Sequence, residues 1–230
     1  MIAKGSSGVK AYVGSTEVSK MYKGDVLVYS STPIPLPYDA EIEYLETDGT
    51  AYIDTGISPA SITPTMEARI YRTKVRSATY VCGADGSGNG RFSFAHSSAQ
   101  RIELRLGNYN QYSGYGDTGW NVLKIDWPNR TKYIDGVLKG TSTAAQMDGE
   151  RSEQSILIFC MNSASGTLSA IKSGNRFSYF KLWDNNTTLL RDLIPVRVGT
   201  VGYMYDKVSK QLFGNAAESG AFVLGADVSS

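Results

Sequence analysis

The chain of 230 residues is long enough for one large β domain with a small appendage, or for two small domains. Its 23 basic and 22 acidic residues leave a net charge of +1, and no block of like charge stands out. This balance argues against a nucleic-acid partner and against an anionic-membrane surface, and no apolar run approaches membrane-spanning length.

Residues 1–31 carry the pattern of a small three-stranded β module. Its short runs of strand-forming residues, separated by turns that contain glycine, cover 10–13, 17–22 and 26–29. Strands of this length hardly fold alone, so we expect the module to dock on something else. The first nine residues lack the apolar core of a secretory signal, so we expect no signal peptide in the chain.

The stretch from Tyr12 to Tyr29 resembles a module at the front of many bacteriophage and prophage tail or baseplate-associated proteins. It reads Tyr-Val-Gly-Ser-x-Glu-Val-x-Lys-x-Tyr-x-Gly-Asp-x-Leu-Val-Tyr. The resemblance implies that residues 1–31 attach the chain to a phage tail or baseplate protein. It also implies a location in the virion, or in the host cytoplasm before assembly.

A proline-rich segment, 32–37, follows the module. Its three prolines stand at alternate positions, where they deny hydrogen-bond donors to a sheet and favour an extended polyproline conformation. We therefore expect a fairly stiff linker here and a separate main domain over 38–230.

Short strand patterns dominate the main domain, and only 144–154 could hold a helical turn. Apolar residues alternate with polar ones at Met66, Ala68 and Ile70. The run 132–138 reads as a hairpin with an Asp-Gly tip, and Phe180 and Leu182 share one side of a later strand. A sheet with one apolar face needs a second layer, which predicts an all-β fold of two antiparallel sheets.

Both ends of this domain resemble a laminin-G-like, concanavalin-A-like domain widespread in phage and gut-bacterial proteins. The opening match covers 43–56, and the closing match covers 193–208 and continues through Phe213-Gly-Asn215. The resemblance implies a two-sheet antiparallel jelly-roll sandwich whose first and last strands lie close together.

A row of carboxylates on the expected first strand raises the question of catalysis. Family 16 glycoside hydrolases share the jelly roll and carry Glu-x-Asp-x-x-Glu, whose outer carboxylates are nucleophile and acid/base. Glu41 and Glu46 have the spacing of that outer pair, but Glu43 replaces the Asp, and the hydrolases place the motif deep in the sandwich. We therefore favour a solvated carboxylate row and expect that the protein is not an enzyme.

Other candidate chemistry is sparse. His96 is the single histidine, so any Ser-His-Asp triad would have to use it, and a structural role is favoured. Cys82 and Cys160 are expected to be buried thiols, although a disulfide is possible if their strands are neighbours. No cofactor is expected; calcium is possible at Asp85 and Asn89 in a glycine-rich stretch that otherwise reads as a flexible turn.

The most suggestive binding region is an aromatic loop over 107–120. Its aromatic rings can stack on sugar rings, while its amides and carboxylates can bind hydroxyl groups. The predicted ligand-binding residues are Tyr109, Tyr112, Tyr115, Asp117 and Trp120. The alternatives are a protein contact and a loop whose tyrosines only cover the edge of a core.

Together these features predict a non-catalytic adhesion module of a phage or prophage tail-associated protein, recognising cell-surface carbohydrate. One alternative is a purely structural virion decoration or oligomerisation module. The other is a polysaccharide-cleaving hydrolase that uses Glu41 and Glu46.

Overall fold

The computed structural model of the chain describes residues 3–5, 8–13, 16–23, 26–30, 35–72, 79–96, 102–112, 119–170 and 174–228. The chain divides into two compact units, an N-terminal unit of Met1–Pro37 and a C-terminal unit of Tyr38–Ser230. The described residues of both units form strands, turns and two short 3-10 helices, and none of them lies in an α-helix. None of these helices is long and apolar enough to cross a lipid bilayer.

The described residues of the N-terminal unit form five short strands, where the sequence predicts three. Strands β1 (Ala3–Gly5), β2 (Gly8–Val13) and β3 (Thr16–Val18) form one antiparallel sheet, and β4 (Lys20–Lys23) pairs with β5 (Val26–Ser30). The expected single strand over 17–22 is interrupted by a bend at Ser19, so its two halves pair with different partners. Strand β1 carries no strand signal in the sequence, because it has no β-branched or aromatic residue.

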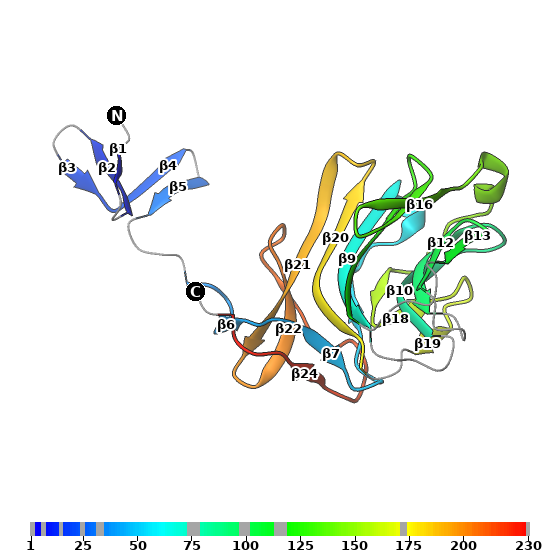
Figure 1. Ribbon diagram of the computed structural model, residues 1–230. Coiled ribbons are helices and arrows are strands. Elements are labelled where there is room, and N and C mark those ends of the chain that lie inside the picture. Colours follow the sequence, from blue (N-terminus) through cyan, green and yellow to red (C-terminus); the bar gives the residue numbers. More distant parts are fainter. Residues whose placement is uncertain are drawn as a thin grey trace. The chain divides into compact units, whose positions relative to one another are not determined.

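The C-terminal unit is built from two sheets, which Figure 1 shows stacked face to face. The smaller sheet has the order β13 (Tyr109–Tyr112), β12 (Ile102–Leu106), β11 (Arg91–His96), β10 (Thr79–Asp85), β17 (Leu157–Ile158) and β8 (Ile53–Asp54). Strands β18 (Cys160–Asn162) and β19 (Leu168–Ala170) continue it beside β10.

The larger sheet has the order β16 (Val137–Thr141), β15 (Thr131–Ile134), β14 (Gly119–Asp126), β9 (Pro64–Arg72), β20 (Arg176–Asp184), β21 (Thr188–Val198), β22 (Val201–Asp206) and β23 (Leu212–Phe213). Strand β6 (Ala40–Glu41) pairs with β21, and β7 (Leu45–Thr47) pairs with β20 and β24 (Phe222–Leu224). The 3-10 helices are η1 (Pro59–Ser61) and η2 (Ala144–Met147), the second within the one stretch where a helical turn was expected.

This architecture confirms the predicted all-β, two-sheet antiparallel sandwich. The first and last strands of the unit also meet as expected, because β7 pairs with β24 through Leu45 and Leu224. Beyond that pair, the Glu43 amide donates to the Ala226 carbonyl over 2.9 Å. The ends of the domain therefore close the larger sheet together.

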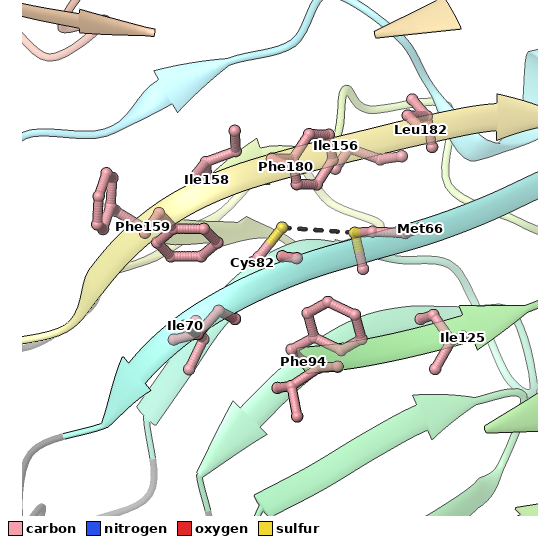
Figure 2. Close-up of a cluster of buried hydrophobic side chains, with 14 of the residues drawn as sticks. Met66, Ile70, Cys82, Phe94, Ile125, Ile156, Ile158, Phe159, Phe180 and Leu182 are labelled. Atoms are coloured by element: carbon pink, nitrogen blue, oxygen red, sulfur yellow. Dashed lines mark hydrogen bonds between the residues drawn. The ribbon is translucent and has the colours of Figure 1, made fainter. Parts of the chain in front are cut away.

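The core lies between the two sheets. From β9, Met66, Ala68 and Ile70 point inward and are at most 2% exposed, as their alternation predicts. Figure 2 shows Met66 and the Cys82 thiol of β10 pointing toward one another, with 3.5 Å between the two sulfurs. Cys160 is also buried, and its sulfur lies 3.9 Å from the Met161 carbonyl oxygen.

The outer face of the larger sheet follows from the same alternation. Because Met66, Ala68 and Ile70 are inward, their neighbours Glu67, Arg69 and Tyr71 must point away from the core. On β20 the inward residues Phe177, Phe180 and Leu182 leave another outward set, formed by Arg176, Tyr179 and Lys181. A β-bulge at Ser178 keeps this alternation in phase with β9.

Candidate functional site

The structure places the predicted aromatic loop in two different sheets. Tyr109 and Tyr112 lie in β13, at the edge of the smaller sheet, whereas Trp120 lies in β14 of the larger sheet. Tyr115 and Asp117 lie outside the described residues. The expectation of one continuous loop over 107–120 is therefore wrong at both ends, because Tyr109–Tyr112 pairs with β12 and Gly119–Asp126 pairs with β9.

Trp120 instead belongs to a row of side chains on the outer face of the larger sheet. In the strand register Trp120 is opposite Tyr71, Tyr71 is opposite Arg176, and Arg176 is opposite Glu46. Directly opposite side chains on one face of a sheet are close enough to interact. Four strands far apart in the sequence thus bring two aromatic rings, a guanidinium and a carboxylate into one line.

The rings and guanidinium groups of this face are in contact. The Tyr71 and Trp120 rings are 5.4 Å apart at 70°, and Tyr44 lies 6.3 Å from Trp120. The Arg69 guanidinium carbon lies 4.5 Å from the centre of the Trp120 ring. The guanidinium of Arg176 lies 4.3 Å from Tyr44 and 5.1 Å from Tyr71. Cation–π contacts therefore hold both arginines against the aromatic surface.

The two arginines differ in their charged partners. Arg176 Nε donates to Glu46 Oε2 over 2.6 Å, and this hydrogen bond raises the pKa of Arg176 above its usual value. Arg69 is exposed and donates to the Ser178 hydroxyl over 3.4 Å, but it forms no ion pair with any described carboxylate. Arg69 therefore keeps hydrogen-bond donors available on the surface.

A second row lies beside the first, in which Val122 is opposite Arg69 and Arg69 is opposite Tyr179. Its members are two residues from Trp120 on β14 and from Tyr71 on β9, and three residues from Arg176 on β20 because of the bulge at Ser178. The Tyr179 hydroxyl donates to Glu67 Oε1 over 3.0 Å, and burial raises the pKa of this phenol, with a smaller contribution from the Glu67 charge. Tyr179 is thus fixed in orientation as a neutral group.

Tyr44, Arg69, Trp120, Arg176 and Tyr179 line a hollow of about 660 Å³, which we call the outer-face pocket. Its volume lies in the range of small-molecule binding sites. Aromatic, cationic, anionic and aliphatic side chains all contribute to it. The lining residues are Glu41, Ile42, Glu43, Tyr44, Arg69, Trp120, Arg176, Ser178, Tyr179, Ile194, Pro195 and Val228.

The carboxylate row does not form the single strand that the hydrolase comparison requires. Glu41 ends β6 and Glu46 lies in β7, and the chain bends at Glu43 between them. Glu41 lines the outer-face pocket and accepts from the Tyr38 hydroxyl over 3.0 Å. Glu46 is not among the described lining residues and is instead engaged by Arg176. The bend arises because β6 pairs with β21 while β7 pairs with β20.

The remaining candidates lie away from this pocket. His96 is 2% exposed at the end of β11, and burial, with the nearby Arg72 charge, lowers its pKa to about 3. Both oxygens of Asp85 are engaged, because Oδ1 accepts from Phe92 and Ser93 while Oδ2 accepts from Arg105.

The second residue of the suggested calcium loop is also engaged. Asn89 donates its side-chain amide to the Ala145 carbonyl and to Asp148. Within the described part of the chain, no group of three or more His, Cys, Asp or Glu residues could hold a metal ion. The loop therefore uses its polar groups in contacts with the rest of the protein.

The sequence predicts Trp120 as a binding residue but does not predict the residues that surround it in the structure. The alternation in β9 already indicated that Arg69 and Tyr71 face outward. Nothing local indicated that Tyr44 and Arg176 would join them, because those contacts depend on pairing between strands more than 100 residues apart.

Comparisons with known proteins address the fold. No protein-family profile and no curated protein matches the sequence. A candidate carbohydrate-binding protein from Bacteroides ovatus superimposes with a TM-score of 0.54 at 13% identity, over 82% of this chain and 62% of that one. This chain therefore spans less than two thirds of that protein.

Two further solved structures resemble the chain more weakly, each with a TM-score of 0.43. They are the CBM40 of the Ruminococcus gnavus IT-sialidase bound to α2,3 sialyllactose, at 14% identity over 61% of this chain and 89% of that one, and a SAP-like pentraxin from Limulus polyphemus, at 13% identity over 84% and 93%. At these identities the first likeness shows the fold alone: the C-terminal unit is similar to the β-sandwich of a candidate carbohydrate-binding protein.

Proposed function

We propose that the C-terminal unit is a non-catalytic carbohydrate-binding module and that its ligand occupies the outer-face pocket. The observation that carries this proposal is the combination of Trp120, Tyr71 and Tyr44 with Arg69 and Arg176 on one sheet face. Aromatic rings offer apolar faces to the C–H surfaces of a sugar, and guanidinium donors with carboxylate acceptors suit its hydroxyl groups.

The position of the pocket favours binding. Trp120, Arg69 and Arg176 project from paired strands, and the bend that carries Glu43 and Tyr44 is held by backbone hydrogen bonds to Ala226 and Gly225. Little order therefore has to be gained when a ligand arrives. Arg176 is held by Glu46 and by two tyrosine rings, and Tyr179 is held by Glu67. Arg69 and Glu43 lie exposed at the pocket and are available to a ligand.

The arrangement of carboxylates supports a binding role over hydrolysis. A retaining glycosidase needs two carboxyl groups about 5–5.5 Å apart that flank the bond to be cleaved. Here Glu46 is committed to Arg176, and Glu41 lies on a different strand. Hydrolysis by this pair is therefore the weaker proposal.

The biological setting is a further part of the proposal. The resemblance of Tyr12–Tyr29 to phage tail modules supports attachment of residues 1–31 to a tail or baseplate protein, with the C-terminal unit displayed for adhesion to cell-surface glycan. The alternative of a decoration or oligomerisation module is favoured by exposed valines, since Val198 and Val201 pair at a hairpin tip and are 37% and 54% exposed. Light scattering at increasing concentration tests the oligomerisation form of this alternative, because that form predicts association of the chain with itself.

A glycan array tests the proposed function directly. We expect the intact chain to bind a subset of glycans and the Trp120→Ala variant to lose about tenfold or more in affinity, because the main stacking surface is removed. Tyr22→Ala is the matched control, since Tyr22 is 55% exposed and belongs to the N-terminal unit.

Thermal unfolding of each variant shows whether the fold is kept. Absence of binding by the folded intact chain to every glycan on the array contradicts the proposed function. Equal binding by the Trp120→Ala variant contradicts the assignment of the site.

A further inference from the structure

A second hollow opens on the same outer face of the larger sheet. It has a volume of about 290 Å³ and is lined by Glu67, Val122, Lys124, Asp126, Tyr133 and Gly136. These residues come from β9, β14, β15 and the turn that follows β15, so the hollow lies toward the β16 edge of the sheet. We call it the β15 pocket.

The two hollows adjoin each other. Tyr179 lines the outer-face pocket, Glu67 lines the β15 pocket, and these two side chains share a hydrogen bond. Likewise Arg69 of the first hollow is directly opposite Val122 of the second in the β9–β14 register. One extended ligand that lies across β9 on the outer face can therefore occupy both hollows.

The β15 pocket offers polar groups that are not taken up by charged partners. Lys124 forms no ion pair with any described residue, and its Nζ lies 5.9 Å from the centre of the Trp183 ring. By contrast, Lys181 in the same row of the sheet lies 3.8 Å from Asp192. The Tyr133 ring is half-buried opposite Lys124, where it adds an aromatic surface. The Lys124 ammonium can donate hydrogen bonds to sugar hydroxyl groups, and the Tyr133 ring can stack on a sugar ring, as proposed for the arginines and aromatic rings of the outer-face pocket.

The combined length of the two hollows exceeds one sugar ring. Ile194 on β21 and Tyr133 on β15 line their opposite ends and are separated by four strand spacings, which is about 19 Å. A single ring cannot contact both ends of such a surface. A linear chain that lies across the strands can fill both hollows at once.

We infer that the β15 pocket is a second subsite and that the module binds a stretch of a linear carbohydrate chain rather than one terminal sugar. This inference rests on the proposed function. Trp120 and Arg69 contact one part of the chain, and Lys124 and Tyr133 contact sugar units further along it.

Calorimetry with oligosaccharides of increasing length tests the inference. The series are those of cellulose, xylan, chitin and amylose, and the repeat oligomers of any polysaccharide that binds on the array. We expect affinity to rise from the disaccharide to longer oligomers and then level off when both hollows are filled. The Lys124→Ala and Tyr133→Ala variants should each lose about tenfold in affinity for long oligomers and bind the disaccharide unchanged. Lys207→Ala, at an exposed lysine outside both hollows, is the control for charge.

The outcomes separate the two proposals. If the disaccharide binds as tightly as the longest oligomer, and folded Lys124→Ala and Tyr133→Ala variants bind as the parent does, the second subsite is overturned and the outer-face pocket stands. If neither the array nor any oligosaccharide series binds to the folded chain, the proposed function is overturned and the second subsite with it.

Discussion

At the scale of single residues, Lys132 is the most unusual group in the sandwich. It is fully buried on β15, and its Nζ lies 3.0 Å from the Ser142 hydroxyl, which in turn donates to the Leu106 carbonyl of the smaller sheet. Burial lowers the pKa of Lys132 from 10.5 to about 8. The lysine thus forms part of a polar link between the two sheets, and below about pH 8 this link contains a buried charge.

The lowered pKa predicts how stability depends on pH. Between about pH 8 and 10.5 the unfolded chain keeps the proton on Lys132 while the folded chain has released it, so the unfolding free energy should rise with pH in this window. In Lys132→Met the rise should disappear, because the variant has no amine to titrate. Urea unfolding at a series of pH values measures the slope, and Lys207→Met is the control for loss of an exposed lysine. A slope that persists in a folded Lys132→Met variant contradicts the assignment.

At the scale of elements, local sequence patterns predict where most strands lie but do not predict which strands pair. The alternation of Met66, Ala68 and Ile70 correctly predicted the inward side of β9, and the Phe180 and Leu182 side of β20 was equally clear. The run from Glu41 to Glu46 has the pattern of one strand, but a bend divides it between β6 and β7. Its two halves pair with β21 and β20, which lie far along the chain, so no local signal marked the division.

The closure of the larger sheet by its terminal strands depends on a small residue. Gly202 on β22 faces β7 and β24, and a Cβ atom there would lie 2.5 Å from Leu45 Cδ2 and 2.6 Å from Leu224 Cδ2. Gly202→Ala should therefore lower the unfolding free energy by about 1–3 kcal/mol through overpacking. Val201→Ala, at a 54% exposed neighbour, should change it by less than about 0.5 kcal/mol. Equal stability of the two variants in urea unfolding would show that the packing at this junction is loose.

At the scale of the whole molecule, the candidate site could be predicted only in part because it is a product of sheet register. Trp120 was identifiable as an aromatic residue in a polar run, yet its neighbours Tyr44, Tyr71 and Arg176 come from three other segments of the chain. A shift of one residue in the β9–β20 pairing would turn either Tyr71 or Arg176 toward the core. The site is therefore specified by the same core packing that fixes the register, and not by a local motif.

This dependence leads to a prediction about the two units. Every described residue that lines the outer-face pocket or the β15 pocket belongs to the C-terminal unit, between Glu41 and Val228. A chain of residues 38–230 should therefore bind glycans found on the array with an affinity within about twofold of the intact chain, because the sheet that holds both hollows is retained. Calorimetry on both proteins measures this, with thermal unfolding as the check that the shorter chain is folded. If a folded 38–230 chain binds glycan tenfold or more weakly than the intact chain, part of the binding surface lies in residues 1–37. That result would contradict the proposal that the C-terminal unit binds glycan and the N-terminal unit serves only for attachment.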